Sequence, residues 1–246
     1  MLKPIKWYKS LATAKGRLEA QAFLVEGQRA INQIMAVQPE AVLEILSTED
    51  TPAYSEYHIR ILTDSQFNSI CSTKTPQGIA AVVRIPADIY SDRLPAGTGG
   101  KVLLLEDIQD PGNVGTLIRT AAAFDFAGVI LTDKCADPLS PKCVQSAAGT
   151  VLSLWVRRTP DYLGLVERLK RNDYTLVATS LDGEDSPQVL QKDKLLLALG
   201  NEASGLSPAL LEMSDHRLKI PVARHKAESL NVAACGAICM YLSSCT

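Results

Sequence analysis

The feature that most constrains the fold of this chain is a regular alternation of strand-like and helix-like segments from Lys101 onward. The strand-like runs are apolar on both faces, as strands are in a parallel sheet that helices cover on each side. They are Lys101–Asp107, Ala127–Asp133, Val151–Arg157, Tyr174–Leu181 and Lys194–Gly200. The helical patterns are Val114–Phe124, Pro141–Ala148, Asp161–Arg171, Pro208–Met213 and Asn231–Leu242. This alternation predicts an α/β domain on a doubly wound parallel sheet.

The first third of the chain predicts a second, smaller α/β unit. The strand-like runs are Ala41–Leu46, His58–Leu62 and Gly78–Ile85, and the helical patterns are Gly27–Val37 and Ser65–Cys71. Residues 86–100 then hold two Pro and three Gly without apolar periodicity, which indicates a linker. We therefore expect a small domain over residues 1–88, a linker over residues 89–100 and a larger domain over residues 101–246.

Composition excludes several classes of protein. Hydrophobic residues make up 46% of the 246 residues and charged residues 21%, which excludes a mostly disordered chain. No apolar run reaches the ~18 residues of a membrane-spanning helix, and the start of the chain lacks the apolar stretch of a signal peptide. We expect a soluble cytoplasmic protein with reduced cysteines. Its six Cys and three His lack metal-ligand spacing, so no metal is expected.

The net charge of −2 argues against a surface coated with positive charge, but the charges are unevenly distributed. Residues 1–30 hold six Lys and Arg against two Glu, whereas residues 31–70 hold one Arg against six acids. Trp7 and Tyr8 lie within the basic stretch. Such aromatic rings among cations can stack on unpaired bases while the cations bind phosphates. Alternatively, the two rings pack into the small domain, and the sequence leaves both interpretations open.

The larger unit contains three unusual polar segments, and the first begins the helix after its first strand. Pro111-Gly112 makes a turn there, and Asn113 is expected to cap the helix. Arg119 lies on that helix among apolar residues, where an arginine is more often paired structurally than catalytic. The segment matches neither a dinucleotide-binding G-x-G-x-x-G nor a phosphate-binding loop, so NAD and ATP are not expected.

The second and third polar segments lie further along the chain. A wholly apolar strand ends in Gly-Asn-Glu-x-x-Gly at Gly200–Gly205, where glycine permits close approach of a ligand and Glu202 is a candidate contact. The third contains Ile220-Pro221 and Glu228–Val232, in which Ser229 or Asn231 would cap the last helix. An ordinary turn or cap would explain each segment taken alone.

Together and in this order, the three segments resemble the motifs of the SpoU (TrmH) family, within the SPOUT superfamily of RNA methyltransferases. The resemblance covers about Lys101 to Leu242 and includes N-x-G-x-x-x-R at Asn113, Gly115 and Arg119. Two stretches near the start, Phe23–Gly27 and Thr75–Val82, are similar to the small substrate-binding domain of that family.

The resemblance implies a SPOUT-type parallel-sheet domain with a C-terminal trefoil knot, preceded by a small α/β substrate-binding domain, in a homodimer. It implies methyl transfer from S-adenosyl-L-methionine to a ribose 2′-hydroxyl of structured RNA, rRNA rather than tRNA, without a DNA or membrane partner. The implied reaction-site residues are Asn113, Arg119, Glu202, Ser229 and Asn231. The implied cofactor-binding residues are Leu199, Gly200, Asn201, Gly205, Ile220, Pro221 and Leu230.

Three rival interpretations stay open at this point: a tRNA 2′-O-methyltransferase of the same family, a catalytically silent RNA-binding protein on this fold, and a methyltransferase that acts on a base. The chain also departs from the usual third motif. Residues 223–228 contain no Gly and one residue more than that motif, and they include Arg224, His225 and Lys226. This departure leaves the cofactor contacts of the loop open and adds basic groups to it.

Overall fold

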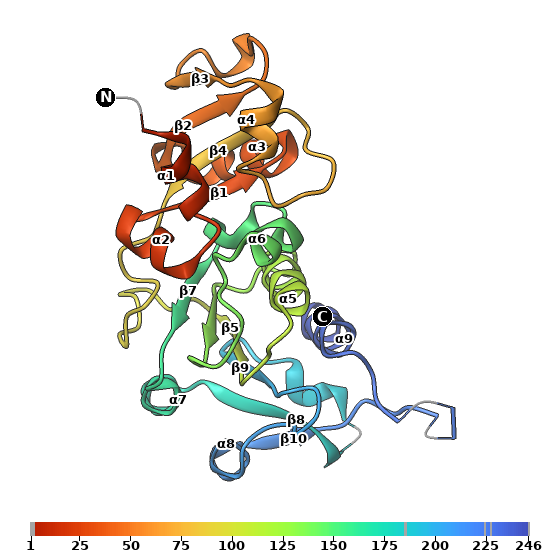
Figure 1. Cartoon of the computed structure of the whole chain (residues 1–246). Coiled ribbons are helices and arrows are strands. Elements are labelled where there is room, and N and C mark those ends of the chain that lie inside the picture. The colour runs from red at the N-terminus through yellow and green to blue at the C-terminus, as the bar shows by residue number, and fades with distance from the viewer. Residues whose placement is uncertain (1–2, 185, 224, 227, 246) are drawn as a thin grey trace.

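The computed structural model describes residues 3–184, 186–223, 225–226 and 228–245, which form two separate β-sheets (Figure 1). The first sheet has the strand order β1-β4-β2-β3, with β4 antiparallel to β1 and β2, and β2 parallel to β3. Its strands are β1 (Ala22–Glu26), β2 (Val42–Ser47), β3 (Ile59–Ile61) and β4 (Ile79–Arg84). Its helices are α1 (Ile5–Ser10), α2 (Ala14–Ala20), α3 (Gln28–Val37) and α4 (Asp64–Asn68), with short 3₁₀ turns η1 (Pro39–Ala41) and η2 (Pro52–Tyr54).

The small sheet is covered on both faces because successive residues of β1 and β4 are apolar and point to opposite faces. In β1, Phe23 and Val25 pack with Ile31 and Ile34 of α3. The intervening Leu24 packs in a separate cluster with Tyr8 of α1. Strand β1 was not among the predicted strands, although its five residues form the run AFLVE.

The second sheet contains six strands in the order β10-β8-β9-β5-β6-β7, and every pairing in it is parallel. The strands are β5 (Lys101–Leu105), β6 (Gly128–Leu131), β7 (Trp155–Arg158), β8 (Thr175–Glu184), β9 (Leu195–Leu199) and β10 (His216–Leu218). The prediction of an α/β fold with a parallel sheet is therefore confirmed.

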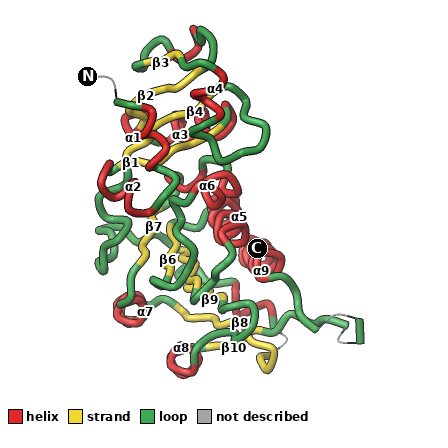
Figure 2. The backbone as a smooth tube through the Cα atoms, in the orientation of Figure 1, coloured by secondary structure: helices red, strands yellow, loops and turns green. Residues whose placement is uncertain are grey.

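Helices cover both faces of this sheet, as the two-sided apolar strands require. Figure 2 shows α5, α6 and α9 gathered on one side of it and α7 and α8 on the other. Their bounds are α5 (Pro111–Ala123), α6 (Pro141–Ala147), α7 (Tyr162–Arg171), α8 (Pro208–Met213) and α9 (Val232–Ser244), with 3₁₀ turns η3 (Thr150–Leu152) and η4 (Pro187–Leu190). Alternation along β5 divides the core, because Leu103 packs toward α5 and α9 whereas Leu104 packs toward α7 and α8.

Two details of the second sheet differ from the sequence prediction. The strand expected at Val151–Arg157 begins only at Trp155, and Val151 and Leu152 lie instead in η3. Both residues are buried, but η3 packs against α3 and α5, so their apolar character reflects burial and not an extended backbone. Strand β10 was not predicted because three residues at a sheet edge carry little pattern.

The chain order reverses between the two central strands β5 and β9, since β5 continues to β6 on one side and β9 pairs with β8 on the other. Their carboxyl ends are joined, because Glu106 N donates a hydrogen bond to Leu199 O at 2.9 Å. Open α/β sheets bind ligands in the crevice at such a reversal. The fold thus directs attention to the edge where α5 and the segment after β9 begin.

The two parts of the chain are tied together by buried cations. Arg17 of α2 is 2% exposed and pairs with Asp137, which follows β6. In the connecting residues 86–100, Ile89 is buried and Asp88 pairs with Arg157 of β7. Among the described residues, no helix is both long and apolar enough to cross a membrane.

Candidate active site

A hydrogen-bonded network joins one residue from each of the three polar segments at the carboxyl edge of the large sheet. Asn113 Nδ2 donates to Glu202 Oε1 at 2.8 Å, and Asn113 Oδ1 accepts from Asn231 Nδ2 at 3.1 Å. Glu202 lies 89 residues and Asn231 118 residues further along the chain. The fold therefore gathers three distant segments around the side chain of Asn113, in a solvent-accessible position.

The start of α5 leaves the Asn113 side chain available for this role. Asp110 is the N-cap residue, and its Oδ1 accepts from Asn113 N at 2.8 Å, with Pro111 in the first helical position. The expectation that Asn113 caps the helix is therefore wrong. Asn113 is the third residue of the helix, where Asp110 already accepts from its backbone amide and its side chain bonds Glu202 and Asn231.

Asn231 has a double role because it caps α9 and donates to Asn113 at the same time. Its Oδ1 accepts from Ala233 N at 2.9 Å and from Ala234 N at 3.3 Å. Of the two expected cap residues, the structure thus uses Asn231 and not Ser229. Helix α9 lies close to α5 and β9, since a Cβ at Gly236 would come within 2.4 Å of Leu117 Cδ2.

The turn after β9 is shaped by Asn201 and its two flanking glycines. Asn201 Nδ2 donates to Asp107 O at 2.8 Å, and its Oδ1 accepts from Ala203 N at 2.9 Å. A Cβ at Gly200 would lie 2.3 Å from the carbonyl carbon of Gly205, whose φ is +67°. The turn therefore requires both glycines, and the Asn201 side chain holds it beside β5.

The remaining expected residues are near this edge but outside the network. Arg119 is exposed on α5, six residues after Asn113 and thus about 120° away around the helix. Within the described ranges Arg119 makes no hydrogen bond or ion pair. The structural partner that the sequence analysis considered for it is therefore not found there.

The segment between β10 and α9 holds the rest of the expected set. Ser229 and Pro221 are exposed, Ile220 is half-buried, and Leu230 is 37% exposed. Leu199 is fully buried at the end of β9. Two residues of the altered loop, Arg224 and Ala227, lie outside the described residues, whereas His225 and Lys226 are exposed.

Sequence reasoning missed Glu106, which supports the same edge from the opposite face of the sheet. Glu106 is 4% exposed, and its carboxylate accepts from the Tyr162 hydroxyl of α7 and from Ser207 N at 2.7 Å, at the start of α8. Burial, and then the hydrogen bond to Glu106, raise the pKa of Tyr162 to about 12. The available signal was the pair Glu106-Asp107 at the end of an otherwise apolar strand.

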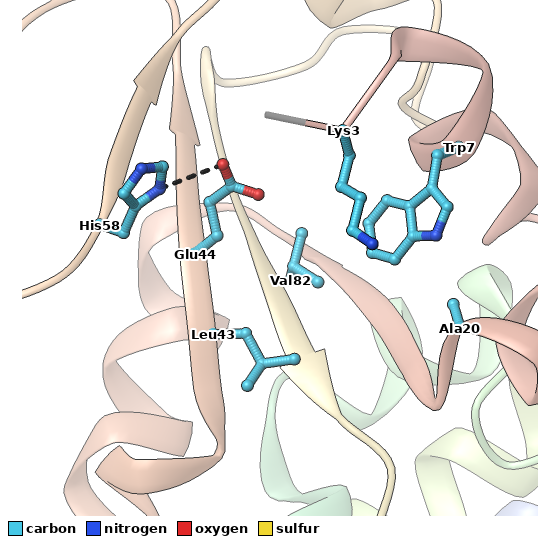
Figure 3. A pocket seen from close by; sticks show the side chains of 7 residues that line it. All are labelled: Lys3, Trp7, Ala20, Leu43, Glu44, His58 and Val82. Atoms are coloured by element: carbon cyan, nitrogen blue, oxygen red, sulfur yellow. Dashed lines mark ion pairs between the residues drawn. The ribbon is translucent and has the colours of Figure 1, made fainter. Parts of the chain in front are cut away.

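Trp7 and Tyr8 of the basic amino-terminal stretch differ in burial. The sequence left open whether these rings face RNA or pack into the small domain. Tyr8 is fully buried and donates to Glu44 Oε2 at 2.7 Å. Trp7 instead lines a hollow of about 480 Å³ opposite Glu44 and His58, whose ion pair measures 3.2 Å (Figure 3). Lys3 Nζ lies 5.3 Å from the centre of the Trp7 ring. Tyr8 thus packs fully into the small unit, whereas Trp7 packs partly against the same apolar cluster and also lines the hollow.

The described part of the chain holds no group of three or more His, Cys, Asp or Glu side chains arranged to bind a metal ion. The groups at this edge include the amides of Asn113 and Asn231, the carboxylate of Glu202 and, further along α5, the exposed guanidinium of Arg119. Such groups orient a polar substrate and stabilise charge.

Comparison with known proteins gives two family matches. Residues 100–241 match the SpoU rRNA Methylase family, and residues 3–81 match the MRM3-like substrate binding domain. The chain is 36% identical to the 23S rRNA (guanosine(2553)-2′-O)-methyltransferase RlmP of Bacillus subtilis, over 96% of this chain and 94% of that protein. It is 29% identical to the 23S rRNA (uridine(2479)-2′-O)-methyltransferase of Streptomyces viridochromogenes, over 96% of this chain and 87% of that protein.

The fold is also similar to that of solved structures. The SpoU methyltransferase AviRb from Streptomyces viridochromogenes, in complex with the cofactor AdoMet, superposes with a TM-score of 0.84 at 25% sequence identity. The match covers 99% of this chain and 97% of that one. Family match, full-length relatives and fold agree with the resemblance carried by the three polar segments, and the chain belongs to the SpoU rRNA methylase family.

Proposed function

We propose that this protein transfers a methyl group from S-adenosyl-L-methionine to a ribose 2′-hydroxyl in rRNA. Full-length relatives carry out ribose 2′-O-methylation of 23S rRNA, and a relative of the same fold binds AdoMet. The observation that carries the proposal for this chain is the Asn113–Glu202–Asn231 network, since it unites the three family segments at one ligand-binding edge.

The residues around the β9 turn fit the cofactor. A Cβ at Gly205 would meet nothing within 4 Å, so the turn has open space on that side. Ile220 and Leu230 offer partly exposed apolar surface for an adenine ring, and Pro221 directly follows Ile220. We assign cofactor binding to Leu199, Gly200, Asn201, Gly205, Ile220, Pro221 and Leu230, with Asn201 acting through the shape of the turn.

The bound sulfonium supplies an activated methyl group, and the chain has to prepare the hydroxyl. A ribose hydroxyl is a weak nucleophile at neutral pH, so its orientation and the stabilisation of its developing charge set the rate. We assign these tasks to Asn113, Arg119, Glu202, Ser229 and Asn231. The unpaired guanidinium of Arg119 orients the hydroxyl or an adjacent phosphate.

We also propose the organisation that the family resemblance implies. Residues 1–88 form the substrate-binding domain, residues 89–100 the linker, and residues 101–246 a methyltransferase domain with a trefoil knot near its end. The protein works in the cytoplasm as a homodimer, in which a second copy covers the exposed Ile238 and Tyr241 of α9. A molar mass of one chain in light scattering would refute the dimer.

The proposed function is tested by mapping 2′-O-methyl groups in rRNA and tRNA from cells with and without the gene. We expect one rRNA ribose methylation to disappear and to return when purified protein and tritiated cofactor are added. Loss of a tRNA modification instead would refute the rRNA substrate. Unchanged maps, together with no tritium transfer, would leave an RNA-binding protein without catalysis.

A further inference from the structure

A groove of about 690 Å³ lies between the two parts of the molecule, separate from the site described above. We call it the interdomain groove. One wall comes from the end of β1, the start of α3 and residues 72–77, and the other wall comes from α6. At its base the two parts touch closely, because a Cβ at Gly149 would lie 2.3 Å from Ala30 O.

Three exposed cations line the interdomain groove: Arg29, Lys74 and Lys142. Over the part of the chain that the structure describes, none of them makes a hydrogen bond or ion pair. Arg29 and Lys74 belong to the small unit, whereas Lys142 belongs to α6 of the large one. The groove therefore presents three unneutralised positive charges contributed by both units.

The one carboxylate among the described lining residues, Glu26, is already engaged. Its Oε1 accepts from the amide and the hydroxyl of Ser72, both at 2.7 Å, and its Oε2 accepts from the Thr73 hydroxyl at 2.6 Å. These bonds hold residues 72–75 in place beside Lys74. Glu26 thus shapes the loop, and it does not pair with any of the three cations.

One wall of the interdomain groove contains residues of Phe23–Gly27 and Thr75–Val82, the two stretches that resemble the substrate-binding domain of the family. Gly27 ends the first stretch with φ +90°, and a Cβ there would lie 3.0 Å from Gln77 Oε1 of the second. Gly27 N donates to Ile79 O at 3.0 Å. The two stretches therefore meet at the groove wall, where the backbone angle of Gly27 favours glycine.

The α6 wall leads to the reaction site. Helix α6 packs on α5, and a Cβ at Gly115 would lie 2.3 Å from Cys143 O. A Cβ at Gly112, the residue before Asn113, would lie 4.0 Å from Ser146 Oγ. Ser146 follows Gln145, which lines the groove. The helix that forms this wall of the groove therefore also packs against the first turn of α5, which carries Asn113.

We propose that the interdomain groove binds the phosphates of the RNA strand, so that both units hold the strand that enters the reaction site. This inference rests on the proposed function, and it adds the place where the protein holds the sugar-phosphate backbone of the RNA. Unpaired Lys and Arg supply sequence-independent affinity for phosphates, and the Thr75, Gln77 and Gln145 side chains add hydrogen-bonding groups. Among the described residues no aromatic ring lines the groove, in contrast to the hollow at Trp7, so bases do not stack there.

The test compares Lys74→Ala, Lys142→Ala and the double variant with the wild-type protein. The matched control is Lys192→Ala, an exposed lysine that precedes β9 at the opposite edge of the sheet. Filter binding to protein-free rRNA from cells lacking the gene gives the affinity over a range of salt concentrations. Each groove lysine should lower the slope of log K against log salt by about 0.7–0.9, and the double variant by about twice that.

Cofactor affinity by calorimetry should stay unchanged in all variants, and Lys192→Ala should also keep the turnover rate of the wild-type protein. If Lys74→Ala and Lys142→Ala keep the slope of Lys192→Ala, the groove does not hold RNA. If only Lys74→Ala changes the slope, the small unit holds RNA by itself and the two-sided groove is refuted. Absence of methyl transfer by the wild-type protein would refute the proposed function, and the salt slopes would still decide on the groove.

Discussion

Two polar clusters lie at the same edge of the same sheet, and they differ in burial and in completeness. On the α7 and α8 face, Glu106 is 4% exposed and accepts from Tyr162 and Ser207. On the α5 and α9 face, Asn113, Glu202 and Asn231 are linked to one another but remain open to solvent. The polar groups of the first cluster have all their partners within the fold, whereas those of the second are accessible for further hydrogen bonds to a substrate.

The difference shows how burial separates a structural polar group from a functional one. A buried carboxylate without donors is costly, so Glu106 is retained only with partners that anchor two helices. An exposed amide network gains little stability from its hydrogen bonds, since water competes for each of them. We therefore expect changes in the first cluster to affect folding and changes around the second to affect turnover.

Replacement of Arg119 by Ala should have the largest effect on turnover. Arg119 is unpaired in the described fold, so its loss costs no internal contact. The loss of one electrostatic contact to the reacting group typically lowers the rate by ~10²–10³. Single-turnover methylation should fall by that factor, with cofactor affinity within a few-fold and unfolding free energy unchanged. Near-normal turnover would remove Arg119 from the reaction site.

Replacement of Tyr162 by Phe should lower the free energy of unfolding while leaving turnover intact. The change leaves one oxygen of the buried Glu106 without its donor, which costs about 1–3 kcal/mol. Urea unfolding at pH 7 measures this loss. An unchanged unfolding free energy would show that Glu106 finds another donor.

The same variant has a pH signature. Because folding raises the pKa of Tyr162 from 10.0 to about 12, its contribution to stability is complete below pH 10 and is lost as the pH rises through 12. The phenylalanine side chain does not titrate, so the variant should lose less stability than the wild type between pH 10 and 12. Equal losses in both proteins would contradict the raised pKa.

Two variants of Asn231 should separate its role as helix cap from its role as donor to Asn113, and they should have the smallest effect on stability. Ala at this position removes both the helix cap and the donor to Asn113, and the lost cap costs about 0.5–2 kcal/mol. Ser keeps a capping oxygen but lacks the amide that donates to Asn113. We expect both variants to lose the same share of methyl transfer, and only the Ala variant to lose stability. Full activity of the Ser variant would exclude Asn231 from the reaction site.

Much of this organisation follows from local sequence. The two-sided apolar runs predict the parallel sheet because strands covered by helices on both faces leave little room for polar residues. Asn231 caps α9, as the sequence allowed, because a short polar side chain bonds its own helix. Asn113 was misjudged because Asp110, three residues earlier, caps the helix and accepts the hydrogen bond of Asn113 N, so that Asn113 lies inside the helix.

The tertiary structure alone decided which groups meet. The Asn113–Glu202–Asn231 network joins residues 89 and 118 positions apart, and the interdomain groove brings Lys142 to Arg29 and Lys74. These contacts could not be predicted from the composition and spacing of one chain, because the packing of helices against the two sheets determines them. The sequence by itself thus determined the sheet and the polar segments, and the packing decided which of their side chains are buried with partners and which face solvent.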